Sequence, residues 1–211
     1  AGKGRDSSGT VTVLRDCDPS AHCATCLVDY KKCQKCPSGY RLYSTATTAT
    51  CLDSTKDTAE NKGKGKDPSD STLLRDCDST LNCLTCLSNF NHCDSCDSAS
   101  SLYLYTDSSG NKKCVKADLG TASPDTAENK GKGLARDSVS GLLVLRDCTG
   151  AKKCMTCLGD ADSCSSCDTA NNMYLYTSSS GSSCLDGSAD TVLNAGKGRD
   201  SSGTVTVLRD C

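Results

Sequence analysis

The residues of this chain that could do chemistry are its cysteines, which number 19 in 211 residues. Eighteen of them fall into three modules with the spacing Cys-x5-Cys-x2-Cys-x6-Cys-x2-Cys, and a sixth cysteine follows after 14, 17 or 16 residues. The modules cover residues 17–51, 77–114 and 148–184. Thiols at such spacings can form disulfides, bind zinc or carry redox chemistry. A fixed framework with one variable gap indicates a covalent scaffold that carries one tolerant loop.

Disulfides are the chemistry that the composition favours. The chain has no Trp, one Phe and 4% aromatic residues, so a hydrophobic core can stabilise modules of this size only weakly. Two Cys-x2-Cys pairs could supply four thiolates to zinc, but a zinc ribbon separates its pairs by about 15 to 20 residues. A thioredoxin-like redox site needs a βαβ setting, which the sequence pattern does not provide. We therefore predict disulfides and no cofactor, with a zinc-binding cysteine-rich protein as an alternative.

Six cysteines allow about 15 pairings, and the sequence does not choose among them. We prefer the pairing of first to third, second to fourth and fifth to sixth cysteine. The last pair has independent support, because these cysteines bracket a predicted hairpin. The preferred pairs are Cys17–Cys26, Cys23–Cys33, Cys36–Cys51, Cys77–Cys86, Cys83–Cys93, Cys96–Cys114, Cys148–Cys157, Cys154–Cys164 and Cys167–Cys184, which leave Cys211 unpaired in this chain.

Short strands must position these cysteines. A lead strand of alternating or aliphatic residues is predicted before each module, at residues 10–14, 71–74 and 142–145. Each lead strand is followed by, or runs into, the sequence Leu-Arg-Asp-Cys, which we expect to contact the preceding module. Within the modules, hairpins are predicted between the fifth and sixth cysteines. Their first strands lie at residues 40–43, 101–106 and 173–177.

The connectors between modules repeat as well, at residues 57–65, 125–133 and, more weakly, 190–198. Asp57 and Glu60 resemble a helix start, and Gly63 stands where a single helical turn would end. The Lys-Gly runs in these connectors are interpreted as solvated segments or partners in lateral salt bridges, rather than as a polyanion site.

Residues 1–17 and 195–211 are identical, so the chain repeats itself with a period of 194 residues. Self-similarity of this kind predicts a tandem array in which each module contacts its neighbours. The predicted fold is small and disulfide-rich, with mostly short β-hairpins and loops, arranged as an elongated tandem-repeat rod. The predicted segments are 1–56, 57–116, 117–185 and 186–211, namely the first repeat with its lead strand, two connectors each with the following repeat, and a last connector with the start of another repeat.

The cysteine content predicts an oxidising, extracellular or cell-surface location. The chain starts at Ala1 rather than Met, so we expect a mature fragment. The longest aliphatic run, residues 142–145, is far shorter than the roughly 20 residues of a membrane span, and a net charge of −2 does not favour nucleic acid. Covalent glycans are expected partners at hairpin tips, although turn formation explains these residues equally well. The candidate O-glycan sites are Thr47, Thr48, Ser108, Ser109, Ser179 and Ser180.

Two sequence features carry a family resemblance. One is the Cys-x-Thr-Cys motif that starts at Cys23, Cys83 and Cys154, and the other is the sequence CQKCPSGY at residues 33–40. Together they resemble furin-like, growth-factor-receptor cysteine-rich repeats, which are abundant in protist surface proteins such as Giardia variant surface proteins and ciliate surface antigens. The resemblance covers the cysteine modules and implies a disulfide-laddered rod with little conventional core.

These observations predict a structural protein rather than an enzyme, namely a tandem-repeat segment of an extracellular fibre or cell-surface coat. The expected partner is the protein itself, in a continuous or end-to-end array. The first alternative is a binding module, such as an adhesin or a variable surface antigen, whose exposed loops should diverge while the framework stays fixed. Here the loops of the three modules are similar in composition and do not diverge strongly, which favours the structural interpretation.

Overall fold

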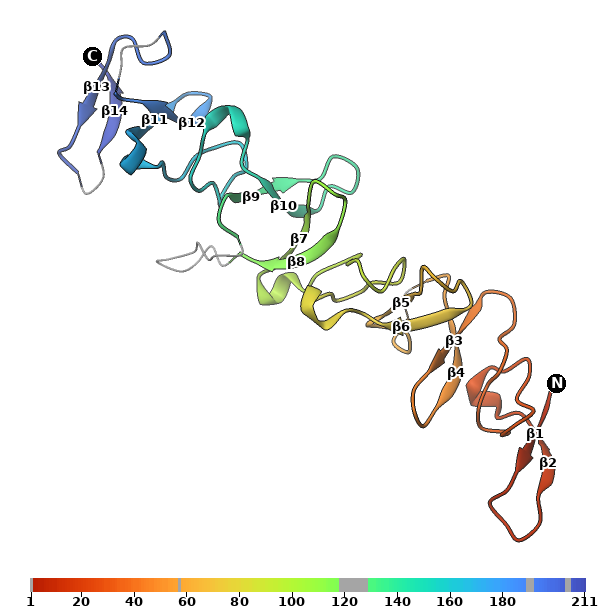
Figure 1. Ribbon diagram of the computed structural model, residues 1–211. Helices are drawn as coiled ribbons and strands as arrows, with labels where there is room; N and C mark the ends of the chain where they lie inside the picture. The colour runs from red at the N-terminus through yellow and green to blue at the C-terminus, as the bar shows by residue number, and fades with distance from the viewer. Residues whose placement is uncertain (1, 57, 118–128, 189–191, 204–205) are drawn as a thin grey trace. The chain divides into compact units, whose positions relative to one another are not determined.

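The computed structural model describes residues 2–56, 58–117, 129–188, 192–203 and 206–211. The chain divides into two compact units, one of residues 1–96 with 112–114 and the other of residues 97–111 with 115–211. Figure 1 draws the strands with their labels. In the described residues the secondary structure is short strands and single 3₁₀ turns. The prediction of a small, strand-rich, disulfide-rich fold is therefore confirmed. The predicted segment boundaries at residues 56, 116 and 185 stay a prediction.

In the part of the chain that the structure describes, the strands form one two-stranded sheet and three four-stranded sheets, and the four-stranded sheets share one topology. Each four-stranded sheet contains a module's hairpin, the connector strand that follows it and the lead strand of the next module. The sheets are β1 (Lys3–Asp6) and β2 (Val13–Asp16); β4 (Ala49–Asp53), β3 (Tyr40–Ser44), β6 (Leu73–Asp76) and β5 (Lys64–Lys66); β8 (Lys112–Lys116), β7 (Leu102–Thr106), β10 (Leu143–Asp147) and β9 (Lys132–Arg136); and β12 (Gly181–Asp186), β11 (Met173–Ser178), β14 (Val207–Asp210) and β13 (Lys197–Asp200).

The segment between the first and second cysteine of each module forms a 3₁₀ turn, and the residue after the turn has a positive φ. The Asp18 and Asp78 side chains accept hydrogen bonds from backbone N–H groups within the first two of these turns, as N-cap residues do. Similar turns precede the second and third hairpins. The five turns are η1 (Pro19–Ala21), η2 (Ser79–Leu81), η3 (Ser98–Ser100), η4 (Gly150–Lys152) and η5 (Thr169–Asn171).

Two expectations about the strands need correction. The lead strands run through Leu-Arg-Asp up to the first cysteine, so they lie about two residues later than predicted. The Lys-Gly segments are strands rather than solvated connectors, and each pairs antiparallel with its lead strand, as Lys64 does with Asp76. The sequence did not predict these strands because a segment such as Lys-Gly-Lys does not alternate apolar and polar residues. The Lys-Gly strand forms because its backbone pairs with a neighbour on each edge, and not because its side chains are buried.

The glycine of each Lys-Gly strand allows the close approach of the following cysteine module. A Cβ atom on Gly65 would lie 2.2 Å from the Cys86 carbonyl oxygen and 2.5 Å from the Phe90 backbone nitrogen. The backbone of Lys66 bonds to this loop on both sides, since its N–H donates to Leu87 at 3.2 Å and its carbonyl accepts from Phe90 at 3.1 Å. The connector strand therefore lies between a lead strand and a cysteine loop, where only glycine fits.

Among the described residues, buried apolar side chains form small clusters. The larger one consists of six buried side chains, Tyr105, Val115, Ala117, Leu134, Leu145 and Leu158. In the first module the buried cluster is Ala21 with Cys33 and Cys51, so the sulfur atoms themselves form part of the core. Disulfides therefore provide much of the stabilisation that a hydrophobic core provides in a larger domain.

Two glycines in identical sequences provide a matched test of this packing. A Cβ on Gly4 would lie 2.2 Å from the Cys26 carbonyl oxygen, whereas a Cβ on Gly198 would meet only the Cys211 sulfur at 3.6 Å. Gly4→Ala should therefore weaken the hydrogen bond from the Tyr30 N–H to Arg5 by about 1–3 kcal/mol, a typical cost of overpacking. The measurement is hydrogen exchange of the Tyr30 amide, which should become about tenfold faster or more. Equal effects of Gly4→Ala and Gly198→Ala on that amide would contradict the proposed packing.

Candidate functional site: the joint between modules

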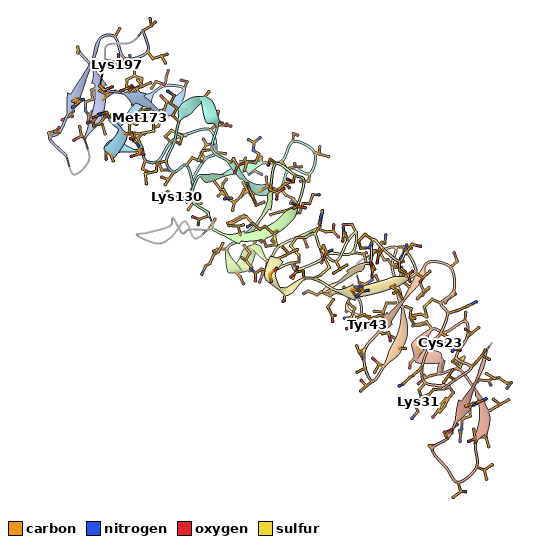
Figure 2. The ribbon with its side chains drawn as sticks, viewed as in Figure 1. Cys23, Lys31, Tyr43, Lys130, Met173 and Lys197 are labelled. Atoms are coloured by element: carbon orange, nitrogen blue, oxygen red, sulfur yellow. A yellow bond between two sulfur atoms is a disulfide. The ribbon has the colours of Figure 1, made fainter. Side chains whose placement is uncertain are left out.

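The predicted site residues are the framework cysteines, and the structure joins eighteen of them in nine disulfides. In every module the first cysteine bonds the third, the second bonds the fourth and the fifth bonds the sixth, which is the pairing preferred from the sequence. Figure 2 draws these side chains, with Cys23 of the first module labelled. Cys211 carries an exposed free thiol. A disulfide cysteine offers no thiolate, so the framework leaves no four-thiolate set for zinc.

A second recurrent arrangement is the joint at which a hairpin meets the lead strand of the next module. The first strand of the hairpin pairs with the lead strand in parallel, and the register is the same in all three joints. A tyrosine of the hairpin lies opposite the lead-strand leucine in each case. These pairs are Tyr43 with Leu74, Tyr105 with Leu145, and Tyr176 with Leu208.

Each joint tyrosine lies between a lysine and an aspartate. In the first joint, the Tyr43 hydroxyl donates a hydrogen bond to Asp76 at 2.8 Å, and the Lys64 ammonium lies 4.7 Å from the centre of the Tyr43 ring. Lys64 and Asp76 are directly opposite in the β5–β6 pair, so one antiparallel register positions both. The ring thus receives a cation on its face while its hydroxyl contacts a carboxylate.

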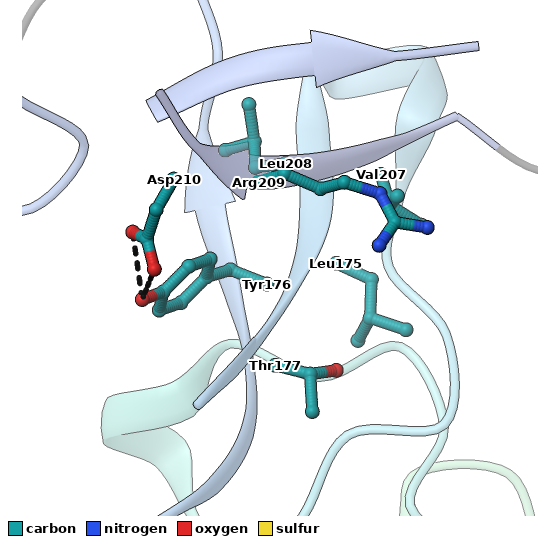
Figure 3. Close-up of a pocket in the computed structure, with 7 residues that line it drawn as sticks. All are labelled: Leu175, Tyr176, Thr177, Val207, Leu208, Arg209 and Asp210. Atoms are coloured by element: carbon teal, nitrogen blue, oxygen red, sulfur yellow. Dashed lines mark hydrogen bonds between the residues drawn. The ribbon is translucent and has the colours of Figure 1, made fainter. Parts of the chain in front are cut away.

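The second and third joints repeat these contacts. The tyrosine hydroxyls donate to the lead-strand aspartates at 2.8 and 3.0 Å, and the lysine ammonium groups lie 4.8 and 4.6 Å from the ring centres. The residues are Tyr105, Asp147 and Lys132 in the second joint, and Tyr176, Asp210 and Lys197 in the third. Figure 3 shows the third joint, where a groove runs between the hairpin and the lead strand.

In the first and second joints the environment raises the pKa of the tyrosine. The hydrogen bond to Asp76, burial and the charge of Asp76 all raise the pKa of Tyr43. Burial, followed by the hydrogen bond to Asp147 and its charge, raises the pKa of Tyr105 to about 12. Both shifts favour the neutral phenol, which is the form that can donate to a carboxylate. These tyrosines therefore serve as structural hydrogen-bond donors rather than as bases.

The predicted Leu-Arg-Asp contact is confirmed for the leucine and the aspartate, which touch the preceding hairpin. The arginine has another role, because Arg75 forms an ion pair with Asp67 across the β5–β6 hairpin. The side-chain and backbone hydrogen bonds from Ser69, with help from Arg75, lower the pKa of Asp67 to about 2. The same pair recurs as Asp200 with Arg209. It therefore stabilises the hairpin that carries the joint.

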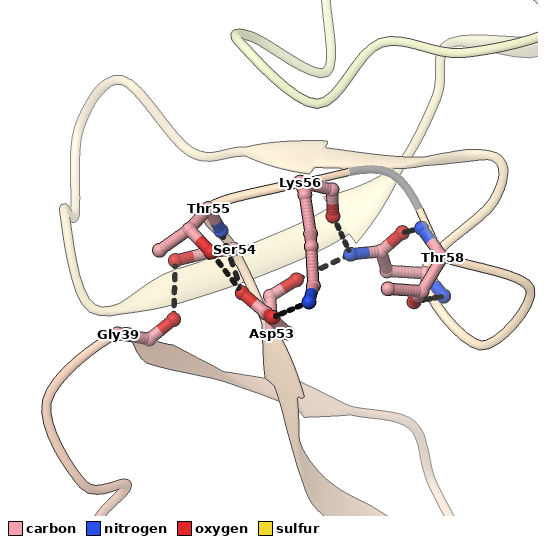
Figure 4. A network of polar contacts seen from close by, with 7 residues as sticks. Gly39, Asp53, Ser54, Thr55, Lys56 and Thr58 are labelled. Carbon is pink, nitrogen blue, oxygen red and sulfur yellow. Dashed lines mark hydrogen bonds and ion pairs between the residues drawn. The ribbon is translucent and has the colours of Figure 1, made fainter.

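A buried asparagine ties each connector to its hairpin, and sequence reasoning missed it. Asn61 is fully buried, and its Nδ2 donates to the carbonyl oxygens of Asp53 and Lys56. Figure 4 shows Asp53, Lys56 and Thr58, which belong to this network in the first connector. Its Oδ1 accepts a hydrogen bond from the Thr58 N–H at 2.8 Å. Asn129 and Asn194 donate in the same way to the residue two positions after the sixth cysteine. The signal in the sequence was an asparagine two residues before the connector glycine in all three copies.

The predicted helical turn exists in the first connector, but one residue later than expected. The Lys62 N–H donates to the Thr58 carbonyl at 3.0 Å, and Thr58 and Asn61 form the reciprocal contact that the sequence assigned to Asp57 and Glu60. Gly63 ends the turn with a φ of +74°. Asp57, residues 125–128 and residues 190–191 lie outside the described residues, as do the parts of the predicted connector turns that they would form.

The six candidate O-glycan residues are exposed at the tips of the three hairpins. The second and third tips contain Gly110 and Gly181 at positive φ, in agreement with the predicted turns. Thr47 and Thr48 lie in a tip without glycine, where hydroxyls such as that of Thr45 hold the turn.

Among the described residues, no group of three or more His, Cys, Asp or Glu side chains is arranged to hold a metal ion. No helix in the described part of the chain has the length and apolar character of a membrane span. Comparison with known proteins finds no matching family model, no matching curated protein and no matching solved structure. The disulfide content is compatible with an extracellular, disulfide-stabilised protein.

Tyr105 should ionise well above the usual range of a tyrosine. Because its pKa is raised to about 12, the contribution of its hydrogen bond to stability is complete below about pH 10 and is lost as the pH rises through 12. Phenolate absorbance after rapid pH jumps should contain a step near pH 12 that disappears in Tyr105→Phe. The control Tyr103→Phe, in the same strand, should keep that step. A titration in which both variants lose the same step would contradict the assignment.

Asn61→Asp should destabilise the first joint at neutral pH. The substitution removes both Nδ2 donors and places a carboxylate beside two carbonyl oxygens, at a cost of about 1–3 kcal/mol for each unsatisfied buried group. Since such a carboxyl would have a raised pKa in the folded state, the deficit should shrink as the pH falls from about 7 to about 4. Urea unfolding at both pH values, with the disulfides intact, measures this loss of unfolding free energy. The exposed Asn91→Asp is the control, and an equal loss for the two variants would refute the role of Asn61.

Proposed function

We propose that this chain is a structural tandem-repeat segment of an extracellular fibre or cell-surface coat. The observation that carries the proposal is the recurrence of one joint, with its tyrosine in the same register, at three places along the chain. A linker that only tethers modules needs no repeated hydrogen bonds, glycines or buried asparagines. A protein whose task is to hold successive modules in a fixed arrangement does need them.

The covalent framework supports the same proposal. Nine disulfides in 211 residues suit a protein that must persist outside the cell without a large core. The resemblance of the modules to furin-like cysteine-rich repeats of protist surface proteins points to the same setting. We propose that the modules follow one another as an elongated rod, and that the partner of the segment is further protein of its own kind.

We propose no enzymatic role. The polar side chains that recur in the joints are engaged with one another, as Tyr43 is with Asp76 and Lys64. Glycans on the exposed hairpin tips are part of the proposal, because exposed serine and threonine residues gather at all three tips. An adhesin or variable antigen would instead use these tips to bind a partner, and removal of all six hydroxyl residues would then abolish binding while leaving any assembly intact.

The chemical basis can be tested on the intact chain. Alkylation of the oxidised protein should label one thiol, that of Cys211, whereas alkylation after reduction and unfolding should label all 19 cysteines. Electron microscopy of the native material should show a regular fibre that a reductant dissolves. Several labelled thiols before reduction, bound zinc in metal analysis, or discrete particles indifferent to reductant would each count against the proposal.

A further inference from the structure

The N-terminal hairpin β1–β2 carries a joint surface without its hairpin partner. Among the described residues it forms a sheet of two strands, whereas the other three lead strands belong to sheets of four. Leu14 of β2 is 68% exposed, although its counterparts Leu74, Leu145 and Leu208 are 3%, 1% and 5% exposed. The sequence does not cause this difference, because residues 1–17 and 195–211 are identical.

The polar part of the joint is already in place on this surface. Lys3 and Asp16 are opposite each other and form an ion pair at 2.9 Å. They correspond to Lys197 and Asp210, which hold Tyr176 in the third joint. A groove lies beside them, and its lining includes Leu14 and Tyr30.

The apolar part is also present and exposed. Leu158, which follows the third cysteine of its module, is buried in one cluster with Leu145 and Tyr105. Leu27 follows the third cysteine of the first module and is 64% exposed. Leu14 and Leu27 are therefore the counterparts of two residues that a tyrosine-bearing hairpin covers elsewhere in this chain.

We propose that the face formed by Lys3, Leu14, Asp16 and Leu27 is a docking surface for the hairpin β11–β12 of another copy of this segment. Strand β11 would pair in parallel with β2, with Tyr176 of that copy opposite Leu14, its ring beside Lys3 and its hydroxyl donating to Asp16. The choice of β11 rests on sequence identity, because in this chain β11 already pairs with residues 207–208, whose sequence is that of residues 13–14. The occupant is the hairpin of a separate molecule of this chain.

This inference rests on the proposed structural function and specifies its partner surface. It also predicts competition, since residues 195–211 of a chain occupy the hairpin that a second chain's residues 1–17 would use. The attached segment has an effective concentration of roughly millimolar, so it normally excludes the other chain. Releasing that segment should make the hairpin available.

The test uses the full, oxidised chain with Leu208→Asp, which places a charge at a buried position of β14 and should detach residues 195–211. Sedimentation should then show concentration-dependent, head-to-tail association. Adding Leu14→Asp should weaken this association about tenfold or more, as expected for loss of a buried leucine. Adding Val11→Asp, at a residue that is 70% exposed and outside the face, should leave it unchanged.

Monomeric Leu208→Asp with its disulfides formed would overturn the inference, and so would association that Leu14→Asp does not weaken. Val207→Asp in the same strand replaces Leu208→Asp if that variant fails to oxidise correctly. The outcome is separable from that of the proposed function, because the fibre test depends on reductant. A fibre assembled through other surfaces would still dissolve on reduction while these variants stayed monomeric.

Discussion

The structure depends on the disulfide between the first and third cysteine of each module, because this bond sets the position of the loop that accepts the connector strand. The bond joins cysteines at a sequence separation of 9 in every module. The backbone after the third cysteine then pairs with the Lys-Gly strand, as Phe90 does with Lys66. A loop without cross-links and with so little apolar burial would not stay in place to form that edge. The β-pairing of the connector strand therefore depends on the disulfide.

Successive modules are joined by backbone pairing rather than by a continuous hydrophobic core. The Lys-Gly strand is bonded on one edge to a lead strand and on the other to a cysteine loop, and the lead strand in turn is bonded to the preceding hairpin. Side chains select the register, because a shift by one residue would turn Tyr43 away from both Lys64 and Asp76. Asn61 then binds the connector to the C-terminal end of the same hairpin, through the Asp53 carbonyl oxygen. Each joint is therefore specified several times over with few apolar residues.

The presence of a disulfide framework could be inferred from the sequence, because the cysteine spacing repeats, but the spacing alone does not choose among the possible pairings. The hairpins could be inferred as well, from alternating Leu-Tyr strands and from glycines such as Gly110 at the tips. The contact of the Leu-Arg-Asp sequence with the preceding module could be inferred from its repetition, but the partners in that contact could not. The parallel pairing joins Tyr43 to Leu74 across a module boundary, and no local periodicity predicts such a pair. The Lys-Gly strands were misinterpreted for a related reason. Their β-structure comes from two neighbouring backbones and not from their own propensity.

The two identical 17-residue segments separate the effect of sequence from the effect of context. Leu14 and Leu208 have the same neighbours along the chain, yet one is exposed and the other is buried. The ion pair of Lys3 with Asp16 forms in the absence of a tyrosine, so the lead hairpin is preorganised for the contact and is not shaped by it. Preorganisation lowers the entropic cost of docking a hairpin. It therefore explains how a joint with one tyrosine and one or two leucines can be specific, and why the same lysine, leucine and aspartate recur wherever a lead strand begins a module.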